Sequence, residues 1–155
     1  MNTPKWKQYL LLYLFGITKV PMIFFVRPRI VNMDDAESRI LIPFKRRNRN
    51  HLRSLYIGAL VVGADLCAGI LALHHARQAG KRILPVFKDL SCEFLKRANG
   101  PTEFVCTEGA EIAALVARAA QTGERQTRTL SGQAFSLEGG ERVHVMNFKI
   151  TLSVK

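Results

Sequence analysis

The sequence contains few cysteines and no pattern typical of a metal site. Cys67, Cys92 and Cys106 are too few and too widely spaced for a disulfide framework, and no C-x-x-C pair is present to suggest zinc. His74 and His75 are neighbours in a segment expected to be helical, where adjacent side chains point in different directions. We therefore expect reduced, mostly buried cysteines in a cytoplasmic protein, and no metal.

Acidic residues are also scarce. Twelve aspartates and glutamates oppose 23 lysines and arginines, which gives a formal net charge of +11. Such a surplus favours a polyanionic partner, namely nucleic acid, an anionic membrane or a phosphate-bearing cofactor, and charge alone does not choose among them. The composition, 48% hydrophobic and 23% charged, is that of a folded globular chain, and 155 residues correspond to one ordinary domain.

Long hydrophobic runs without a polar interruption are missing as well. The run 9–26 is broken by Lys19 and Pro21 and falls short of the roughly 20 apolar residues that a membrane span requires. No small-x-small cleavage site follows it, so we expect no signal peptide. The run 54–73 is long enough, but a charge at Asp65 would cost about 2.5 to 3.5 kcal/mol on insertion. We expect a helix buried in a soluble fold and no membrane span.

The order of elements predicts an α+β fold. Apolar periodicity predicts a helix over residues 4–18, and we expect its apolar stripe to pack on the domain. The stripe comprises Trp6, Leu10, Tyr13, Leu14 and Ile17. The elements that follow are a hairpin over 29–44, a basic loop over 45–53, a central helix over 54–78, strands over 83–95 and 104–107, a helix over 111–120, and paired strands over 125–137 and 143–154. This order suits an antiparallel sheet wrapped around one long helix, the hotdog plan. We assign residues 1–24 to an N-terminal helical segment and residues 25–155 to the hotdog domain.

Asp65 is the only formally charged residue between Ser54 and Ala76. We expect the helix around it to begin with a Ser54 cap, to end at Gly80 and to be enclosed by protein, because it is apolar on all sides and rich in glycine and alanine. Burying an ionised carboxylate without partners is costly. Asp65 therefore either bonds backbone groups or an arginine across an interface, or it lies in a dry site where a raised pKa lets it act as a base near neutral pH.

The spacing of residues around Asp65 resembles the phenylacetyl-CoA thioesterase-like branch of the hotdog superfamily. In that branch an asparagine precedes a His-Gly-Gly turn, and the following helix carries an aspartate or glutamate seven residues after the second glycine. Here Gly58 matches the second glycine, since 65 − 58 = 7, and Asn50 matches the asparagine, 15 residues before Asp65. Tyr56 and Ile57 stand in place of the histidine and the first glycine.

A wider resemblance, to a bacterial subgroup of thioesterase-like hotdog proteins, extends over nearly the whole chain. The segments that carry it are 19–21, 26–30 and 146–155. Where many members of the superfamily have a serine or threonine on the strand after the helix, this chain has Phe87 and Lys88. The chain thus matches the catalytic pattern only in part.

The resemblance implies an acyl-CoA or acyl-carrier-protein thioesterase. The N–H of Gly58 would polarise the thioester carbonyl, Asp65 would activate a water molecule or attack the carbonyl carbon itself, and Asn50 would hold the water or the acid. Members of the superfamily assemble this site across a dimer interface, so a homodimer or a dimer of dimers is expected. The alternative is a non-catalytic protein that binds acyl groups or coenzyme A and has lost turnover through the departures from the pattern. A dehydratase of this fold would pair the acid with a histidine, which this chain lacks at the matching turn.

A cluster of cations just ahead of this site is either a solvated loop or a docking site for the phosphates of coenzyme A, to which arginine forks are suited. Its five members within nine residues are Lys45, Arg46, Arg47, Arg49 and Arg53. We assign the four arginines and Tyr56 to substrate binding, and we expect coenzyme A only as part of the substrate, with no separate cofactor. No nucleic-acid module or aromatic platform accompanies the charge, so we expect no nucleic-acid partner.

Overall fold

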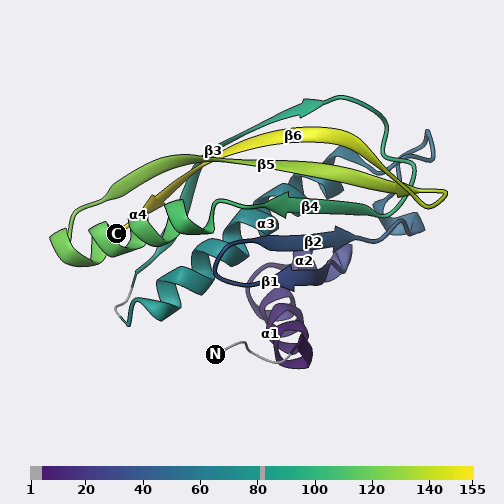
Figure 1. Ribbon diagram of the computed structural model, residues 1–155. Coiled ribbons are helices and arrows are strands. Elements are labelled where there is room, and N and C mark those ends of the chain that lie inside the picture. Colours follow the sequence, from purple (N-terminus) through teal and green to yellow (C-terminus); the bar gives the residue numbers. More distant parts are fainter. Residues whose placement is uncertain (1–4, 81–82) are drawn as a thin grey trace.

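An antiparallel sheet curves around one long helix in the part of the chain that the structure describes (Figure 1). In this computed structural model that part comprises residues 5–80 and 83–155, with the backbone alone at residues 5–9 and 11. The strands are β1 (Arg29–Met33), β2 (Ser38–Ile42), β3 (Pro85–Phe94), β4 (Thr102–Cys106), β5 (Gln126–Glu138) and β6 (Glu141–Val154). The helices are α1 (Lys5–Thr18), α2 (Pro21–Val26), α3 (Ile57–Gln78) and α4 (Gly109–Thr122), with a 3-10 turn η1 (Arg46–Asn48). The strand order is β1-β2-β4-β5-β6-β3, and the predicted hotdog fold is confirmed.

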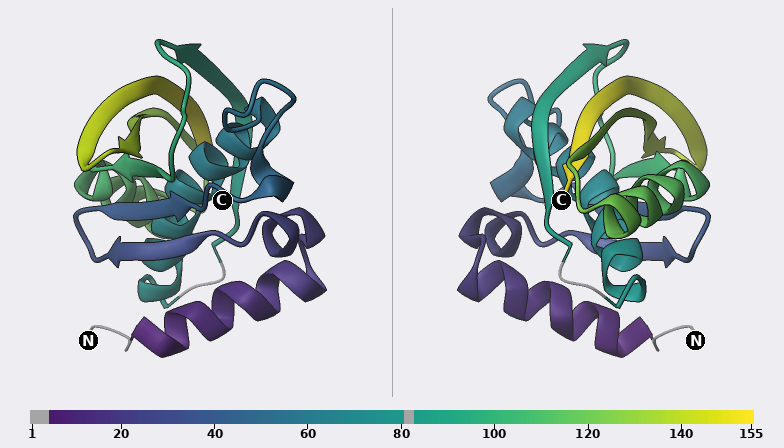
Figure 2. Two further views of the ribbon diagram at one scale, coloured as in Figure 1. Left: turned by 90° about the vertical axis from the view of Figure 1, so that its right-hand side faces the viewer. Right: turned by 90° about the vertical axis from the view of Figure 1, so that its left-hand side faces the viewer.

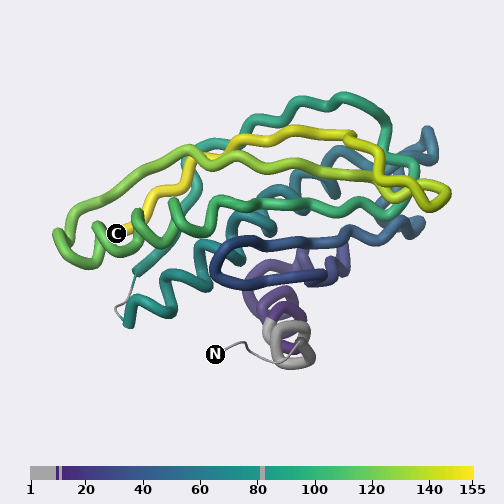
Figure 3. The backbone as a smooth tube through the Cα atoms, in the orientation of Figure 1, coloured from purple at the N-terminus to yellow at the C-terminus, as the bar shows by residue number. Residues whose placement is uncertain are grey.

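The two longest strands, β5 and β6, form a hairpin that runs along the whole sheet (Figure 3). Gly139 and Gly140 make its turn with φ values of 57° and 91°, in the region that favours glycine. This is the predicted turn, and it closes so tightly that Glu138 pairs with Glu141. The far side of β6 pairs with β3, so that β3, which follows α3 in the sequence, forms one edge of the sheet.

Helix α3 fills the hollow of the sheet because its small residues let the strands approach closely. The ring of Phe104 on β4 lies where a side chain at Gly63 would be, and Ala64, Ala68 and Leu71 are fully buried against the sheet. By length and composition α3 meets the criteria for a membrane span, but half of that apolar window is buried inside the protein. The helix is therefore the core helix of the fold, as the position of Asp65 predicts.

Two expectations about α3 are wrong. The helix begins at Ile57, after an N-cap at Tyr56 without a side-chain bond, and not at Ser54. Ser54 instead donates its hydroxyl hydrogen to Oδ1 of Asn50 at 3.2 Å, within the preceding loop. The helix is also not enclosed on all sides, because only 11 of its 22 residues are buried. The face turned away from the sheet is partly open, and Asp65 lies on it.

Helices α1 and α2 precede the sheet, and α1 lies along the outside of the molecule next to β1 (Figure 2). Helix α2, which the sequence analysis missed, starts with Pro21 in its first turn. The predicted helix over residues 4–18 is present, but the expectation that its apolar stripe packs on the domain is wrong. Leu10, Tyr13, Leu14 and Ile17 are about half exposed, while Leu12 and Gly16 face inward. The backbone of Phe24 comes within van der Waals distance of Gly16, which sets this orientation. The side chain of Trp6, the remaining member of the stripe, lies outside the described part.

The C-terminal end of α3 is tied to the turn between β1 and β2. Nε2 of His74 lies 2.7 Å from Oδ1 of Asp35, and Nε2 of His75 lies 3.0 Å from the backbone oxygen of Asp35. Gln78 donates to the same carboxylate at 2.8 Å. The adjacent histidines thus serve as a structural link, and in the described residues no group of three metal-ligating side chains occurs.

Candidate functional site

Asn50 organises the loop that leads into α3. Its Oδ1 accepts the backbone N–H of Leu52 at 2.9 Å and that of Ser54 at 3.2 Å, and Arg53 takes a left-handed conformation with φ of 60°. Such Asx turns stabilise tight loops. The carbonyl oxygen of the side chain is therefore occupied within the loop, and the amide nitrogen is the part of Asn50 suited to a substrate or water.

Gly58 is the second residue of α3, a position at which a backbone N–H has no acceptor within the helix. The next two N–H groups, those of Ala59 and Leu60, both donate to the carbonyl oxygen of Tyr56 at 2.9 and 3.1 Å. The Tyr56 ring lies against Gly58, so that a side chain at Gly58 would overlap it. The N-terminal end of the helix dipole adds a positive potential, so this turn suits a developing oxyanion.

Asp65 lies two turns further along the partly open face of α3. Its side chain is exposed in the single chain, which corrects the expectation of full burial, because the sheet covers only the opposite face of the helix. The surrounding protein still desolvates the carboxylate enough to raise its pKa, and no charge contributes to that shift. Within the described residues the carboxylate of Asp65 has no hydrogen bond or ion pair, so the chain itself offers no structural partner for this side chain.

Gly58 and Asp65 of one chain lie far apart along α3. Seven residues at about 1.5 Å per residue place the two backbones roughly 10 Å apart. The Gly58 N–H and the carboxylate of the same chain are too far apart to contact one carbonyl group directly. A site in which both groups contact the same thioester therefore needs a second chain.

Phe87 and Lys88 occupy the place on the strand after the helix where many members of the superfamily have a serine or threonine. The ring of Phe87 on β3 faces Gly69, one turn after Asp65, and would lie 3.4 Å from a Cβ at that glycine. Lys88 falls in a bulge between Phe87 and Asp89 and is exposed. The structure thus provides no serine or threonine at this place.

The predicted cation cluster divides between two hollows. A hollow of about 620 Å³ beside Asn50 is lined by Arg46, Arg49, Asn50, His51 and Arg53. Arg47 lies elsewhere, with its guanidinium 6.0 Å from the centre of the Phe25 ring and an N–H 3.5 Å from the Phe25 carbonyl oxygen. Lys45 lines a larger groove against α1 and α2 together with Arg46 and Arg47. Three of the four predicted arginines therefore lie together with Asn50.

Sequence reasoning missed the apolar residues at the end of β3. Phe94 and Leu95 line a hollow of about 370 Å³ together with Asn50 and Ile57, and Lys96 lies at the same hollow. Both apolar side chains are more than two-fifths exposed, at 44% and 42%. The signal in the sequence was two large apolar residues at a strand end, followed by two cations.

The outer edge of β3 has no partner strand in the described part of the chain. β3 pairs only with β6, although it is ten residues long. Val86 and Phe94 on this strand are 51% and 44% exposed, and Tyr56 and Ile57 add exposed apolar surface near the start of α3. A long free edge with apolar side chains is a surface suited to a second chain.

The comparisons with known proteins agree with this fold. The family described as a domain of unknown function (DUF4442) matches residues 10–154. No curated protein matches the sequence significantly.

The solved structures that resemble this chain include three that cover almost its full length. A Pseudomonas aeruginosa protein described as of unknown function and a probable thioesterase is 25% identical, with a TM-score of 0.75 over 100% of this chain and 99% of that chain. A protein of unknown function from Chlorobaculum tepidum gives a TM-score of 0.79 at 13% identity, over 97% of this chain and 95% of that chain. Zebrafish thioesterase superfamily member 2 gives a TM-score of 0.66 at 8% identity, over 98% and 99%. The last two support the fold alone.

Proposed function

Since this chain belongs to the DUF4442 family and has the fold of the hotdog thioesterases, we propose that it hydrolyses an acyl thioester of coenzyme A or of an acyl carrier protein. The observation that carries the proposal is Asp65. It is a single carboxylate on the open face of an apolar helix, its pKa is raised by desolvation, and it has no structural partner among the described residues. A raised pKa brings a carboxylate closer to the range in which it accepts a proton near neutral pH.

The proposed reaction uses three groups. The carbonyl oxygen of the thioester accepts the Gly58 N–H, and the amide of Asn50 orients a water molecule. Asp65 takes a proton from that water as its oxygen attacks the carbonyl carbon. The C–S bond then breaks, and the leaving thiolate receives the proton from Asp65, which yields a free acid and a thiol. Direct attack by Asp65 through an anhydride, followed by hydrolysis, is the variant of this reaction with the same residues.

We place this site between two chains. The separation of about 10 Å between Gly58 and Asp65 along α3 favours an arrangement in which Asp65 of one chain faces Gly58 and Asn50 of another. The free edge of β3 supplies a surface for such pairing. Light scattering at micromolar concentration tests this arrangement, and a strictly monomeric species that is active would rule it out.

The hollow lined by Arg46, Arg49 and Arg53 is the proposed docking site for the phosphates of coenzyme A. It adjoins Asn50, so the thioester end of a bound ligand has a short path to the start of α3. We also assign to ligand contact the ring of Tyr56, which is 53% exposed next to the start of α3. Arg47 contributes through long-range charge, since its guanidinium lies over Phe25.

The direct test is to incubate the purified protein with a panel of acyl-CoAs and to measure hydrolysis as the release of free thiol. The second candidate is a non-catalytic acyl-binding protein, and two features favour it: the Tyr56 ring lies against Gly58, and Phe87 stands where many members of the superfamily have a serine or threonine. Saturable binding without thiol release across the panel would support that candidate. The free state of all three cysteines agrees with the proposed cytoplasmic location.

A further inference from the structure

Helices α1 and α2, which pack against each other, leave six large apolar side chains about half exposed. On α1 they recur at the spacing of one helix face, and two more follow on α2. They are Leu10 (49% exposed), Tyr13 (50%), Leu14 (48%), Ile17 (47%), Met22 (57%) and Phe25 (53%). Isolated exposed apolar residues are ordinary, but a contiguous patch of this kind marks an interaction surface.

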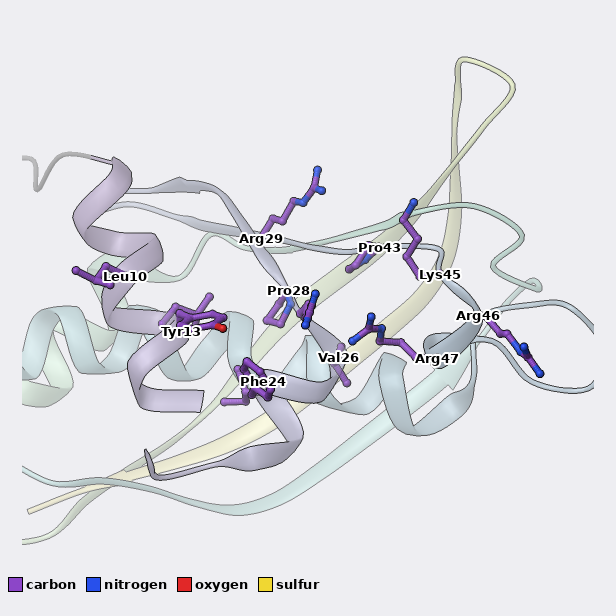
Figure 4. A pocket seen from close by; sticks show the side chains of 13 residues that line it. Leu10, Tyr13, Phe24, Val26, Pro28, Arg29, Pro43, Lys45, Arg46 and Arg47 are labelled. Carbon is purple, nitrogen blue, oxygen red and sulfur yellow. The ribbon is translucent and has the colours of Figure 1, made fainter. Parts of the chain in front are cut away.

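Cations lie beside two aromatic rings of α2. The guanidinium of Arg27 is 5.6 Å from the centre of the Phe24 ring, and that of Arg47 is 6.0 Å from the centre of the Phe25 ring. Both arginines line a groove of about 1450 Å³. Figure 4 shows Leu10 and Tyr13 on its helix side and positive side chains along the opposite rim. Those cations are Arg29, Lys45, Arg46 and Arg47.

The surplus of positive charge is concentrated in this half of the chain. Residues 1–64 hold 11 lysines and arginines and three acidic residues, so 11 − 3 = +8 of the net +11 lies there. The first acidic residue is Asp34, so the sequence of α1 and α2 contains none. The partner of this surface must therefore combine an apolar interior with a dense negative charge.

We propose that α1 and α2 dock this protein on an anionic phospholipid surface. α1 has 14 residues and is about 21 Å long, which is too short to span a bilayer. It would lie in the plane of the interface, with Leu14 and Ile17 between the lipid headgroups and the cations on the phosphates. This inference does not depend on the proposed hydrolysis step, because it uses none of Asp65, Asn50 and Gly58, although Arg46 and Arg47 contribute to both proposals.

A second copy of the chain fits this surface less well than an anionic membrane. In a two-fold dimer the same patch meets itself, so Arg27, Arg29 and Arg47 of one copy would approach the same cations of the other. Like charges brought together across an interface oppose association. A nucleic acid would satisfy the charge but would leave the aliphatic side chains in water.

Cosedimentation with vesicles tests the proposal on the full-length protein. We expect binding to phosphatidylcholine vesicles that contain phosphatidylglycerol, little binding to pure phosphatidylcholine, and a decline as salt is raised. The double variant Leu14→Glu, Ile17→Glu should bind about tenfold more weakly or worse, since both side chains lose their apolar contact. The matched control is Leu137→Glu, an exposed apolar residue on β5, which should bind as the wild type does.

Variants of the cations test whether positive charge on this surface contributes to vesicle binding. Lys19→Gln and Arg27→Asn should each weaken binding by about fivefold, and asparagine tolerates the φ of 55° at position 27. Circular dichroism and light scattering on each variant show whether fold and oligomeric mass are kept. Equal binding to neutral and anionic vesicles would overturn the proposal. So would a Leu14→Glu, Ile17→Glu protein that binds vesicles normally but has a lower oligomeric mass, because the stripe would then be an interface between copies.

Discussion

The ring of Tyr56 lies against Gly58, so that the residue in place of the family histidine lies beside the residue that carries the proposed oxyanion donor. Tyr56 is 53% exposed, and its ring has room to turn away when a ligand arrives. The contact therefore links one departure from the superfamily pattern, Tyr56, to one physical question: whether the carbonyl oxygen of a thioester can reach the Gly58 N–H.

Gly58→Ala tests that relationship. The added methyl group displaces the Tyr56 ring into the space that a carbonyl must enter, and we expect kcat/KM for thioester hydrolysis to fall roughly tenfold to a hundredfold. Stability should change by less than about 1 kcal/mol, since the displaced ring is exposed and alanine favours the helix. Unchanged kinetics would show that the substrate does not approach Gly58.

Gly63→Ala, in contrast to Gly58→Ala, should lower the free energy of unfolding. A methyl group at Gly63 overlaps the buried ring of Phe104, and overpacking of this kind costs about 1 to 3 kcal/mol. Urea denaturation measures it. Gly69→Ala on the same helix is the matched control, because its Cβ would be 3.4 Å from Phe87, an ordinary contact. Its stability should stay the same or rise by up to about 1 kcal/mol; equal losses in the two variants would contradict the packing described for Phe104.

The sequence predicted the fold well because each element carries a local signal. The glycines at 139 and 140 predict the β5–β6 turn. The small residues of α3 predict a helix that the strands approach closely. The orientation of α1 was not predictable in the same way. Periodicity identifies the stripe with Leu14 and Ile17, but only the contact between Gly16 and the Phe24 backbone decides which face turns inward.

The candidate site was predictable as a set of residues but not as a geometry. The spacing from Asn50 to Asp65 follows from the sequence, whereas the exposure of Asp65 depends on which face of α3 the sheet covers. Arg47 illustrates the same limit, because adjacent arginines in a short 3-10 turn point to different neighbours.

Stability should fall as the pH is lowered through the range in which histidine titrates. Burial lowers the pKa of His75 below its usual value of 6.5, so the unfolded chain binds a proton more readily than the folded one. Stability is then fully present above about pH 6.5 and declines below it, by at most about 1.4 kcal/mol per pH unit for one group. Melting temperatures between pH 8 and pH 5 should show a smaller decline for His75→Gln than for the wild type. An identical decline in both proteins would assign the effect to other groups.

Substitutions in the basic loop should show which of the two hollows binds coenzyme A esters. Arg46→Ala and Arg49→Ala should raise KM for coenzyme A esters several-fold, more at low salt than at high salt, because exposed charges are screened. Arg47→Ala should have a smaller effect, since its guanidinium lies over Phe25 outside the hollow. Arg118→Ala on α4 is the control for a general loss of positive charge. Equal KM values for all four variants would contradict a role of the loop in substrate binding and indicate a solvated loop.

Thiol release by Asp65→Asn, measured beside the wild type on the same acyl-CoA panel, tests the central claim most directly. Asparagine keeps the size of the side chain and removes its charge, so kcat should fall by roughly 10² to 10⁴. The melting temperature should stay within a few degrees of the wild-type value, because the side chain of Asp65 is exposed and has no hydrogen bond or ion pair in the described chain. Full thioesterase activity together with a sharply lower melting temperature would contradict the account and make Asp65 a structural residue.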